Sequence, residues 1–371
     1  AVSDTNKLLK RKPTYFIKTD SAGNYNIENI KSNSYRVLAF TDKNSNLMFD
    51  QKTEQFAFIQ DTIIIKNNIK DLNLELYKAD LSKNKIKKTS SKEHTFALTL
   101  DKPITNAKFI NPSNTNFDIN IKAEVLTIFK PENYSFKDTI KTDIIVQDSL
   151  LNVDTLKTKI FFQEPSTKKK TKPQTLAINT NIKNGQEKNN HLNFECYFEY
   201  PIIKTDTNKI IFKTDTLATE KPNYTWITPT HLNININTSA KKQTELIFNN
   251  NAFTNIKGDT SALINIKNKI LQSNELASIQ GFTKVEETKT KIVQLINTET
   301  NEKQEKKFLK QFEFKNIIPG YYTIKIIIDE NLNGIWDPGN INNNTKPEKI
   351  LISPEPFKLR ANFELKNQEI K

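Results

Sequence analysis

Glycine, cysteine, histidine and arginine are all scarce in this chain of 371 residues. The 7 glycines form no G-x-G-x-x-G or G-x-x-x-x-G-K pattern, which excludes the glycine-rich phosphate loops of nucleotide-binding enzymes. The single cysteine, Cys196, cannot form a disulfide within the chain, and its position between alternating phenylalanines indicates a small buried hydrophobe rather than a reactive thiol. No run of about 18 apolar residues occurs, which excludes a membrane-spanning helix.

Histidines and paired carboxylates form no recognisable catalytic site. His94, His191 and His231 lie in separate segments, without a Cys, Ser or Asp at metal-ligand or triad spacing. Glu195 and Glu199 alternate outward from a core strand, where solvated carboxylates are the rule. The sequence therefore predicts a protein that is not an enzyme, with no catalytic residue and no organic cofactor. Catalysis by residues that meet only in three dimensions stays the alternative.

The basic charge of the chain comes almost entirely from lysine. There are 55 basic and 42 acidic residues, a formal net charge of +13. Only Arg11, Arg36 and Arg360 are arginine, whose planar fork suits base edges and phosphates better than lysine does. Because no basic patch is interleaved with aromatic residues, we do not expect nucleic acid as a partner.

Apolar and polar residues alternate along much of the chain. Clear examples span residues 72–76, 96–100, 117–121, 232–236 and 322–328. This spacing places the apolar side chains on one face of a strand, and that face must be covered by another sheet. Helical spacing is rare, and Asn, Asp, Pro and Lys separate the alternating segments. The predicted fold class is therefore all-β, a string of β-sandwich modules.

Two stretches near the two ends of the chain align without a gap. The first is YNIENIKSNSYRVLAFTDKNSNLMFD (25–50), and the second is FEFKNIIPGYYTIKIIIDENLNGIWD (312–337). The identical pairs are Asn29/Asn316, Ile30/Ile317, Tyr35/Tyr322, Asp42/Asp329, Asn44/Asn331, Asn46/Asn333 and Asp50/Asp337. A pattern that recurs in this way indicates two copies of one β-unit.

A weaker repeat lies between these two copies. FALTLDKPI (96–104) is similar to FECYFEYPI (194–202), and each is followed by an Asp-Thr pair, at 154–155 and at 259–260. We therefore expect two related sandwiches between the two terminal units. Polar, unpatterned stretches set the limits of four modules at 1–79, 80–168, 169–272 and 273–371.

The terminal modules resemble a known family. TDSAGNY (19–25), followed by Tyr35 and Val37, resembles the transthyretin-like or carboxypeptidase-regulatory-like β-sandwich, whose pattern is T-D-x-x-G-x-aromatic and then Y-x-V. That family usually has glycine at the second turn. Asn33 stands there in the first module and Gly320 in the fourth. Asparagine also tolerates positive φ, so both residues suit the turn.

The middle modules resemble the SbsA-type bacterial Ig-like domain. Asp101 with Pro103, and Glu199 with Pro201, match the acidic residue and proline that end the first core strand of that domain. The arrangement as a whole, which ends in DENLNGIWDPGN, KPEKI and LRANFEL, resembles the carboxy-terminal part of Ig-like lipoproteins of Bacteroidota.

The resemblance implies a location at the outer membrane or cell surface, and the periplasmic side stays open. It implies protein partners, among them an outer-membrane β-barrel complex, and membrane contact only through a lipid anchor that is absent from this chain. The first module is expected to be truncated at its amino-terminal end. LASIQGFTKV (276–285), which precedes the second copy of the repeat, would project before residue 1 in the first copy.

The repeated pattern D-x-N-x-N-x-x-x-D is the one constellation with ligand chemistry. It comprises Asp42, Asn44, Asn46 and Asp50 in the first copy and Asp329, Asn331, Asn333 and Asp337 in the second. Oxygen atoms at positions 1, 3, 5 and 9 resemble the calcium loops of EF-hands, dockerins and the B-type repeats of bacterial surface proteins. Position 12, which usually supplies a bidentate Glu, holds Thr53 and Asn340, so we expect only modest calcium affinity. The alternative is a hairpin loop closed by Asx-turns.

These features together predict a non-enzymatic surface protein that acts as a structural scaffold or accessory subunit of an outer-membrane protein complex. The rival hypothesis is an adhesion or glycan-binding protein whose loops carry the specificity. Tyr224 and Trp226 would supply the aromatic platform of a glycan site. A Tyr-x-Trp pair on a strand is more typical of half-buried sandwich filling.

Overall fold

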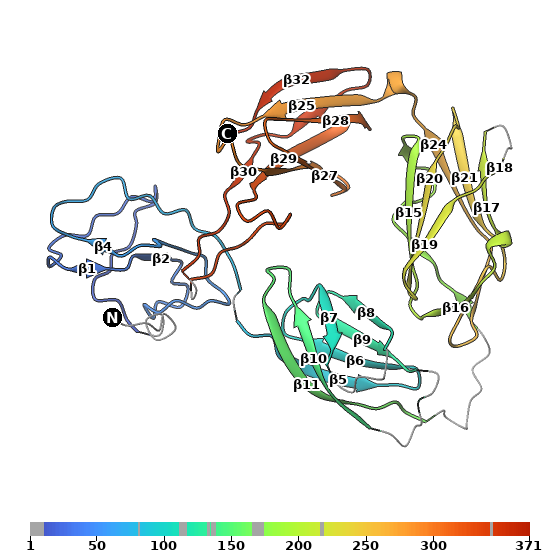
Figure 1. Ribbon diagram of the computed structural model, residues 1–371, viewed down its shortest axis with the longest axis horizontal. Coiled ribbons are helices and arrows are strands. Elements are labelled where there is room, and N and C mark those ends of the chain that lie inside the picture. Colours follow the sequence, from blue (N-terminus) through green and yellow to red (C-terminus); the bar gives the residue numbers. More distant parts are fainter. Residues whose placement is uncertain are drawn as a thin grey trace. The chain divides into compact units, whose positions relative to one another are not determined.

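The computed structural model describes residues 11–80, 82–110, 117–131, 134, 139–164, 174–215, 219–341 and 344–371. This part of the chain is built from strands and contains no α-helix, which confirms the predicted all-β class (Figure 1). The 3-10 helices η1 (Thr207–Lys209) and η2 (Ser273–Glu275) are single turns. Within the described residues, no helix has both the length and the apolar character needed to cross a membrane.

The chain divides into two compact units. The first comprises Ala1–Lys83, Leu150–Asn152 and Asp329–Lys349, and the second comprises Asn84–Ser149, Val153–Ile328 and Ile350–Lys371. The four module limits inferred from composition stay a prediction. Buried side chains form four clusters, and segment 329–349 contributes to the cluster of the first unit.

Two short ladders form the sheet structure of the first unit. β1 (Ser34–Tyr35) pairs with β4 (Ile63–Ile64), and β2 (Leu38–Phe40) pairs with β3 (Phe56–Phe58), both antiparallel. The buried core consists of Phe49, Phe56, Ala79 and Ile341. Nδ2 of Asn344 also donates to the carbonyl of Gln60 at 2.7 Å. The segment 329–349 is therefore an integral part of this unit.

The prediction of a strand at residues 72–76 is wrong. Leu72 and Leu74 are half-buried and Leu76 is 39% exposed, and the segment carries no ladder in the described structure. Only Tyr77 forms an isolated antiparallel bridge, with Phe56. Alternation alone cannot form a strand, because the backbone N–H and C=O groups also need neighbouring strands.

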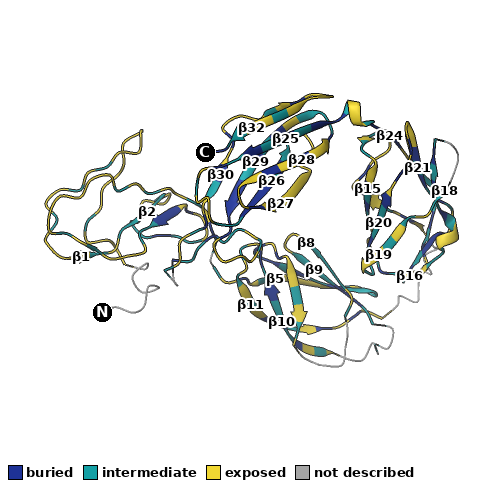
Figure 2. Cartoon of the chain, turned by 45° about the horizontal axis from the view of Figure 1, so that its top comes forward, coloured by how far each residue is buried: buried dark blue, intermediate teal, exposed yellow. Residues whose placement is uncertain are grey.

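The second module is a sandwich of two antiparallel sheets, with strand orders β5-β6-β9-β8 and β11-β10-β7. Its strands are β5 (Ile86–Ser91), β6 (Thr95–Leu100), β7 (Asn106–Phe109), β8 (Ile119–Lys122), β9 (Val125–Phe129), β10 (Ile140–Gln147) and β11 (Val153–Ile160). Alternate residues of β6 and β10 are buried between the sheets (Figure 2). A buried ion pair joins Nζ of Lys102 to Oδ2 of Asp148 at 3.0 Å.

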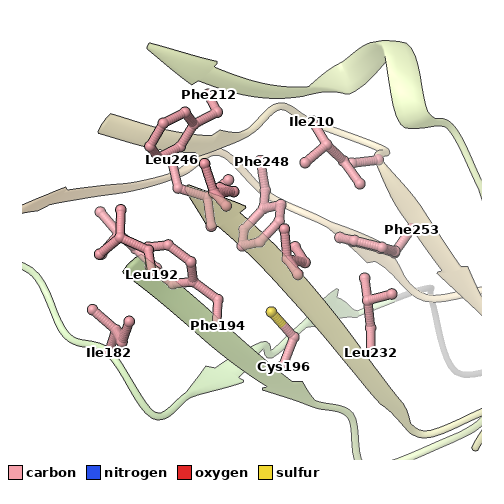
Figure 3. Close-up of a cluster of buried hydrophobic side chains, with 14 of the residues drawn as sticks. Ile182, Leu192, Phe194, Cys196, Ile210, Phe212, Leu232, Leu246, Phe248 and Phe253 are labelled. Atoms are coloured by element: carbon pink, nitrogen blue, oxygen red, sulfur yellow. The ribbon is translucent and has the colours of Figure 1, made fainter. Parts of the chain in front are cut away.

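The third module contains three sheets, with orders β12-β23-β22-β16, β13-β15-β20-β19 and β14-β24-β21-β17-β18. Its first strands are β12 (Thr175–Leu176), β13 (Asn179–Thr180), β14 (Glu187–Lys188), β15 (His191–Tyr197), β16 (Ile202–Thr205) and β17 (Ile210–Thr214). The others are β18 (Thr219–Glu220), β19 (Asn223–Thr228), β20 (His231–Asn237), β21 (Gln243–Phe248), β22 (Phe253–Asn255), β23 (Thr260–Ser261) and β24 (Ile264–Ile270). Cys196 is fully buried among the apolar side chains of this core, which confirms its predicted role (Figure 3).

The fourth module pairs the sheet β28-β25-β32 with the sheet β27-β26-β29-β30, and β31 also joins β29. Its strands are β25 (Ala277–Phe282), β26 (Lys291–Asn297), β27 (Lys303–Phe308), β28 (Gln311–Ile317), β29 (Gly320–Ile328), β30 (Ile350–Ile352), β31 (Phe357–Leu359) and β32 (Glu364–Glu369). Alternate residues of β29 are buried from Tyr322 onward, as the sequence predicts. The fourth module therefore has a complete two-sheet core.

The terminal repeat extends to side-chain hydrogen bonds and backbone conformation. The Tyr35 hydroxyl donates to the Lys31 carbonyl at 2.6 Å, and the Tyr322 hydroxyl donates to the Ile318 carbonyl at 2.8 Å. Residues with positive φ fall at matching positions, namely Asn29/Asn316, Ser45/Leu332 and Leu47/Gly334. Because these bonds and angles are not set by hydrophobic patterning, their recurrence supports the interpretation of the two terminal stretches as copies of one repeated β-unit.

Strand register recurs as well. Ala39 lies opposite Ala57 in the β2–β3 ladder, and Ile326 lies opposite Leu351 in the β29–β30 ladder. Tyr35 lies opposite Ile63 as Tyr322 lies opposite Phe357. In these matched pairs, the connection between the acidic loop and the following strand is longer in the second copy than in the first.

The buried thiol gives a direct test of the third module's core. Burial raises the pKa of the Cys196 thiol to about 12, with a smaller contribution from the nearby Glu195 carboxylate. We expect a thiol-reactive disulfide reagent to leave the native protein unmodified at mildly alkaline pH, because the thiolate is the reacting species and the sulfur is covered. Concentrated guanidinium should expose the thiol and give one equivalent of reaction. Fast labelling of the native protein would contradict the buried position.

Candidate functional site

The acidic loops follow equivalent strands in the two copies of the repeat. Residues 42–50 connect β2 to β3, and residues 329–337 follow β29. Both loops turn sharply through left-handed residues, at Ser45 and Leu47 in the first copy and at Leu332 and Gly334 in the second. Glycine adopts this conformation without strain, whereas Leu47 must be held there by its surroundings.

The first aspartate of each loop is the acceptor that holds the turn. Oδ2 of Asp42 accepts from the Leu47 amide, and Oδ2 of Asp329 accepts from the Gly334 amide, each at 3.0 Å. The asparagine at position 3 accepts from the amide two residues later in both loops, as does the asparagine at position 5. These are Asx-turns, so the bonding of the hairpin alternative is present in both copies.

A buried glutamate closes each loop, and neither glutamate was predicted from the sequence. Oε1 of Glu54 accepts from the Lys43 amide at 2.9 Å, and Oε2 accepts from the Asp50 amide at 2.8 Å. Its side chain thereby joins the two ends of the loop, positions 2 and 9, from a site that is 0% exposed. Charge-assisted bonds of this kind are stronger than neutral ones, and a buried carboxylate requires such partners.

Glu348 does the same in the second copy. Its Oε1 accepts from the Glu330 amide at 2.7 Å and its Oε2 accepts from the Asp337 amide at 3.1 Å, again positions 2 and 9. The indole Nε1 of Trp336 also donates to the Glu348 carbonyl at 2.9 Å. We call Glu54 and Glu348 the loop-closing glutamates. The sequence signal was the similarity of E-Q-F-A-F (54–58) to E-K-I-L-I (348–352), which an ungapped alignment does not reach.

Burial raises the pKa of the Glu348 carboxyl, and the carboxylates of Asp337 and Asp329 act in the same direction. The amide donors of Asp337 and Glu330 partly oppose this shift. A carboxyl whose pKa is higher in the folded state contributes stability below its ordinary pKa and loses that contribution as the pH rises through the folded value. Glu348 therefore favours the folded state more in acid than at neutral pH.

The acidic loops do not present a converged set of oxygen ligands in this arrangement. In the second loop, Nδ2 of both Asn331 and Asn333 donates to Oδ2 of Asp337, so amide nitrogens rather than oxygens face that carboxylate. In the first loop, Asp50 accepts from the Lys52 amide and the Thr53 hydroxyl. No group of three or more His, Cys, Asp or Glu side chains within the described residues is arranged to hold a metal. Calcium binding stays a prediction.

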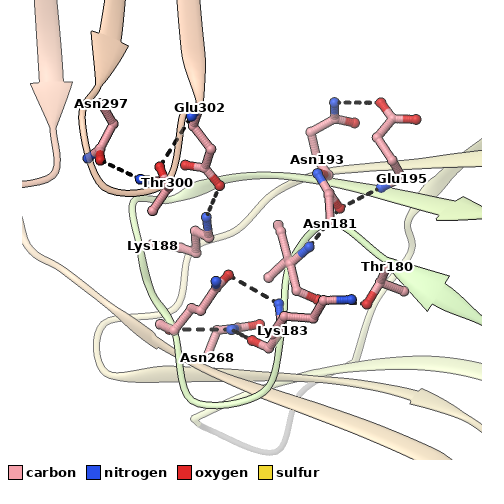
Figure 4. Close-up of polar contacts among 12 residues, drawn as sticks. Thr180, Asn181, Lys183, Lys188, Asn193, Glu195, Asn268, Asn297, Thr300 and Glu302 are labelled. Atoms are coloured by element: carbon pink, nitrogen blue, oxygen red, sulfur yellow. Dashed lines mark hydrogen bonds and ion pairs between the residues drawn. The ribbon is translucent and has the colours of Figure 1, made fainter. Parts of the chain in front are cut away.

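The exposed face of the β15–β20 ladder brings together residues that lie in separate segments of the sequence. Nε2 of His231 forms a hydrogen bond with Oε2 of Glu195, and the Asn233 amide donates to the other oxygen of that carboxylate at 2.6 Å. The Tyr197 ring stacks on the His231 ring with a centroid distance of 4.4 Å. Asn193 completes the network through Glu195 (Figure 4). Strand register produces this polar face, and register is not visible in a list of histidines.

Tyr224 and Trp226 do not form an isolated aromatic platform. Tyr224 packs against the buried core of the third module. The Trp226 ring lies 5.7 Å from the Phe198 ring and 6.4 Å from the Phe253 ring, centroid to centroid, and Trp226 is 38% exposed. Tyr224 is therefore half-buried filling of the core, whereas Trp226 packs on two phenylalanine rings and is partly exposed.

No protein-family model matches this chain, and no curated protein matches it. Among solved structures, titin domains A168–A170 are 8% identical with a TM-score of 0.20, over 76% of this chain and 99% of that one. BcpA, the major pilin subunit of Bacillus cereus, is 11% identical with a TM-score of 0.19, over 63% and 85%. The human desmocollin-1 ectodomain is 10% identical with a TM-score of 0.20, over 92% and 79%. At these scores the similarities support no conclusion about function, and the fold class rests on the strand pairing described above.

The loop-closing role of Glu54 predicts a stability loss without a change of shape. Glu54→Gln replaces one acceptor oxygen with a donor, so either the Lys43 or the Asp50 amide loses its partner. We expect unfolding of the first unit to become easier by about 1–3 kcal/mol, the cost of a buried unsatisfied donor. Calorimetric or denaturant unfolding measures the difference. The exposed Glu75→Gln is the matched control, and equal stability of the two variants would remove the role assigned to Glu54.

The calcium prediction has its own test in the second loop. Calcium binding there requires the side-chain oxygens of Asn331 and Asn333 to turn toward the point at which the Asp337 carboxylate would hold the ion. In that case, millimolar calcium should raise the Tm of the protein, since a ligand that binds only the folded state stabilises it. Asp337→Asn should abolish the increase and Asp61→Asn should not. Identical melting curves in calcium and in a chelator would end the calcium hypothesis.

Proposed function

We propose that this chain is a non-enzymatic protein of the bacterial outer membrane or cell surface, where it acts as a structural scaffold or accessory subunit of an outer-membrane protein complex. Its partners are proteins, and a lipid anchor would provide its contact with the membrane. The proposal is supported by the all-β modular build and by the resemblance to lipoproteins of Bacteroidota noted above.

Direct contacts between the third and fourth modules are the observation that carries the scaffold role. Nζ of Lys188 pairs with Oε1 of Glu302 at 2.9 Å (Figure 4), and Nδ2 of Asn189 donates to the Asn316 carbonyl at 3.0 Å. Lys188 is mostly covered, with 12% of its side chain exposed. Two modules joined by side-chain contacts as well as by a short connection can hold a partner's binding surfaces at a set spacing.

Affinity purification from outer membranes tests the scaffold proposal. The tagged full chain is expressed in a Bacteroidota host with a lipoprotein signal and extracted in mild detergent. We expect a β-barrel protein to co-purify in stoichiometric amount and to resist a high-salt wash. Recovery of the chain free of any membrane protein, from intact and folded preparations, would contradict the scaffold role.

The polar face of the third module favours a second candidate, glycan binding in adhesion. Tyr197 is 46% exposed, and its ring is held by the neighbouring His231 ring, which suits stacking against a sugar. The carboxylate and amides of Glu195, Asn193 and Asn233 lie beside it as hydrogen-bonding groups. A glycan array probed with the wild type and with Tyr197→Ala separates the candidates, since only an adhesin would lose glycan binding in the variant.

A further inference from the structure

The polar face of the third module extends across the sheet β13-β15-β20-β19. Alternate residues of β15 and β20 are buried in the core, so the residues between them point outward. Asparagine occupies three successive outward positions of β20. They are Asn233, Asn235 and Asn237, which lie opposite Glu195, Asn193 and His191 of β15. Strand register thereby joins amide, carboxylate and imidazole groups into one continuous surface.

This face carries almost no charge, although the chain is strongly basic. Lysine and arginine together account for 55 of the 371 residues, yet neither occurs in strands β13, β15, β19 or β20. The only carboxylate of these four strands belongs to Glu195. It forms hydrogen bonds with Nε2 of His231 and, at 2.6 Å, with the Asn233 amide. A ligand of the polar face therefore meets amides and one bonded carboxylate, and no cation of a lysine or arginine.

The sheet β14-β24-β21-β17-β18 of the same module has the opposite character. Nζ of Lys267 lies 3.6 Å from Oε1 of Glu245, and the Asn265 amide donates to the same oxygen. A carboxylate on this sheet is thus paired with an ammonium group, whereas Glu195 on the polar face is paired with imidazole and amides. Further lysines of this sheet are Lys188, Lys213 and Lys269. The lack of lysine is therefore a property of one face and not of the whole module.

The polar side chains of this face are held in place by bonds to one another. Nδ2 of Asn233 donates to Oδ1 of Asn193 at 2.5 Å and to Oε1 of Glu195 at 2.6 Å. Nδ2 of Asn193 donates to the same carboxylate oxygen at 3.0 Å (Figure 4). Each amide or carboxylate oxygen has a second lone pair and can accept a further bond. A ligand that binds groups already held in this way loses less side-chain entropy than one that must order them.

An aromatic ring stands at one end of the polar face, and the face is long. Tyr197 ends β15 and His191 begins it. Three steps of two residues separate them, a span of about 20 Å at the usual rise of a strand. The Tyr197 ring is 46% exposed and lies at 22° to the His231 ring, so it offers a flat apolar surface in a fixed position. Such a face suits a chain of linked units better than a single small molecule.

We propose that the polar face binds an uncharged glycan chain, which lies along β15 with one sugar ring stacked on Tyr197 and its hydroxyl groups bonded to Glu195 and Asn233. Hydroxyl groups both donate and accept, so they match a mixture of amides and carboxylate. An acidic glycan finds no lysine or arginine on this face and meets the like charge of Glu195 instead. The inference rests on the second candidate function, adhesion by glycan binding, and names the class of glycan.

Neutral and acidic oligosaccharides of equal length are the probes, added to the full chain, with calorimetry on the neutral sugar that binds most tightly. We expect its affinity to be the same at low and at high salt, because no ion pair forms. Tyr197→Ala and Asn233→Ala should each weaken binding about tenfold, through the lost stacking and the lost hydrogen bond. Tyr197→Phe keeps the ring and should bind like the wild type. Asn265→Ala, at the asparagine bonded to Glu245 on the other sheet, is the matched control and should leave binding unchanged.

The other outcomes separate this inference from the adhesion candidate. Binding of acidic glycans alone, lost in Tyr197→Ala or lost at high salt, would overturn the class of glycan and leave adhesion intact. Neutral binding that survives both Tyr197→Ala and Asn233→Ala would overturn the site and leave adhesion intact. Absence of binding to every glycan would contradict adhesion and this inference together. Binding of extended peptides in place of glycans, with the same dependence on Tyr197, would overturn the glycan as the ligand.

Discussion

The need to cover the apolar face of every strand governs this protein. Alternating sequences place one row of apolar side chains on each strand, and the hydrophobic effect stabilises the fold only when a second sheet lies over that row. The two copies of the terminal unit show the consequence. Phe314 is fully buried beneath a complete sheet, whereas its counterpart Ile27 is half-buried beside a segment with no ladder. Nearly the same residues thus give a closed core in one place and an incomplete one in the other.

Polar closure of the loops is the second constraint. Each acidic loop bends through residues of positive φ, and a buried glutamate holds its two ends by accepting from two backbone amides. The aspartates and asparagines have the oxygen chemistry of metal ligands, but in both loops they accept hydrogen bonds from the loop's own amides. The fold itself therefore explains why these residues recur in both copies. Their recurrence is not by itself evidence of a bound cation.

The all-β class, the terminal repeat and the buried Cys196 could be predicted from the sequence, because each depends on local alternation or on direct similarity. Glu54 and Glu348 could not, since the insertion after Asp337 hides their equivalence. The strand predicted at 72–76 failed because a ladder needs neighbours that a local pattern does not reveal. The contact of His231 with Glu195 depends on the register between β15 and β20, which only the folded sheet determines.

We conclude that the two terminal repeats are copies of one sandwich and that they differ in the cover over one sheet. Hydrogen exchange of the full chain, followed residue by residue, tests it most directly because slow exchange reports backbone bonds in stable structure. The account predicts strong protection at 312–317 and fast exchange at 25–30, with protection in both β2 and β29. Equal protection at 25–30 and 312–317, or fast exchange throughout β29, would contradict it.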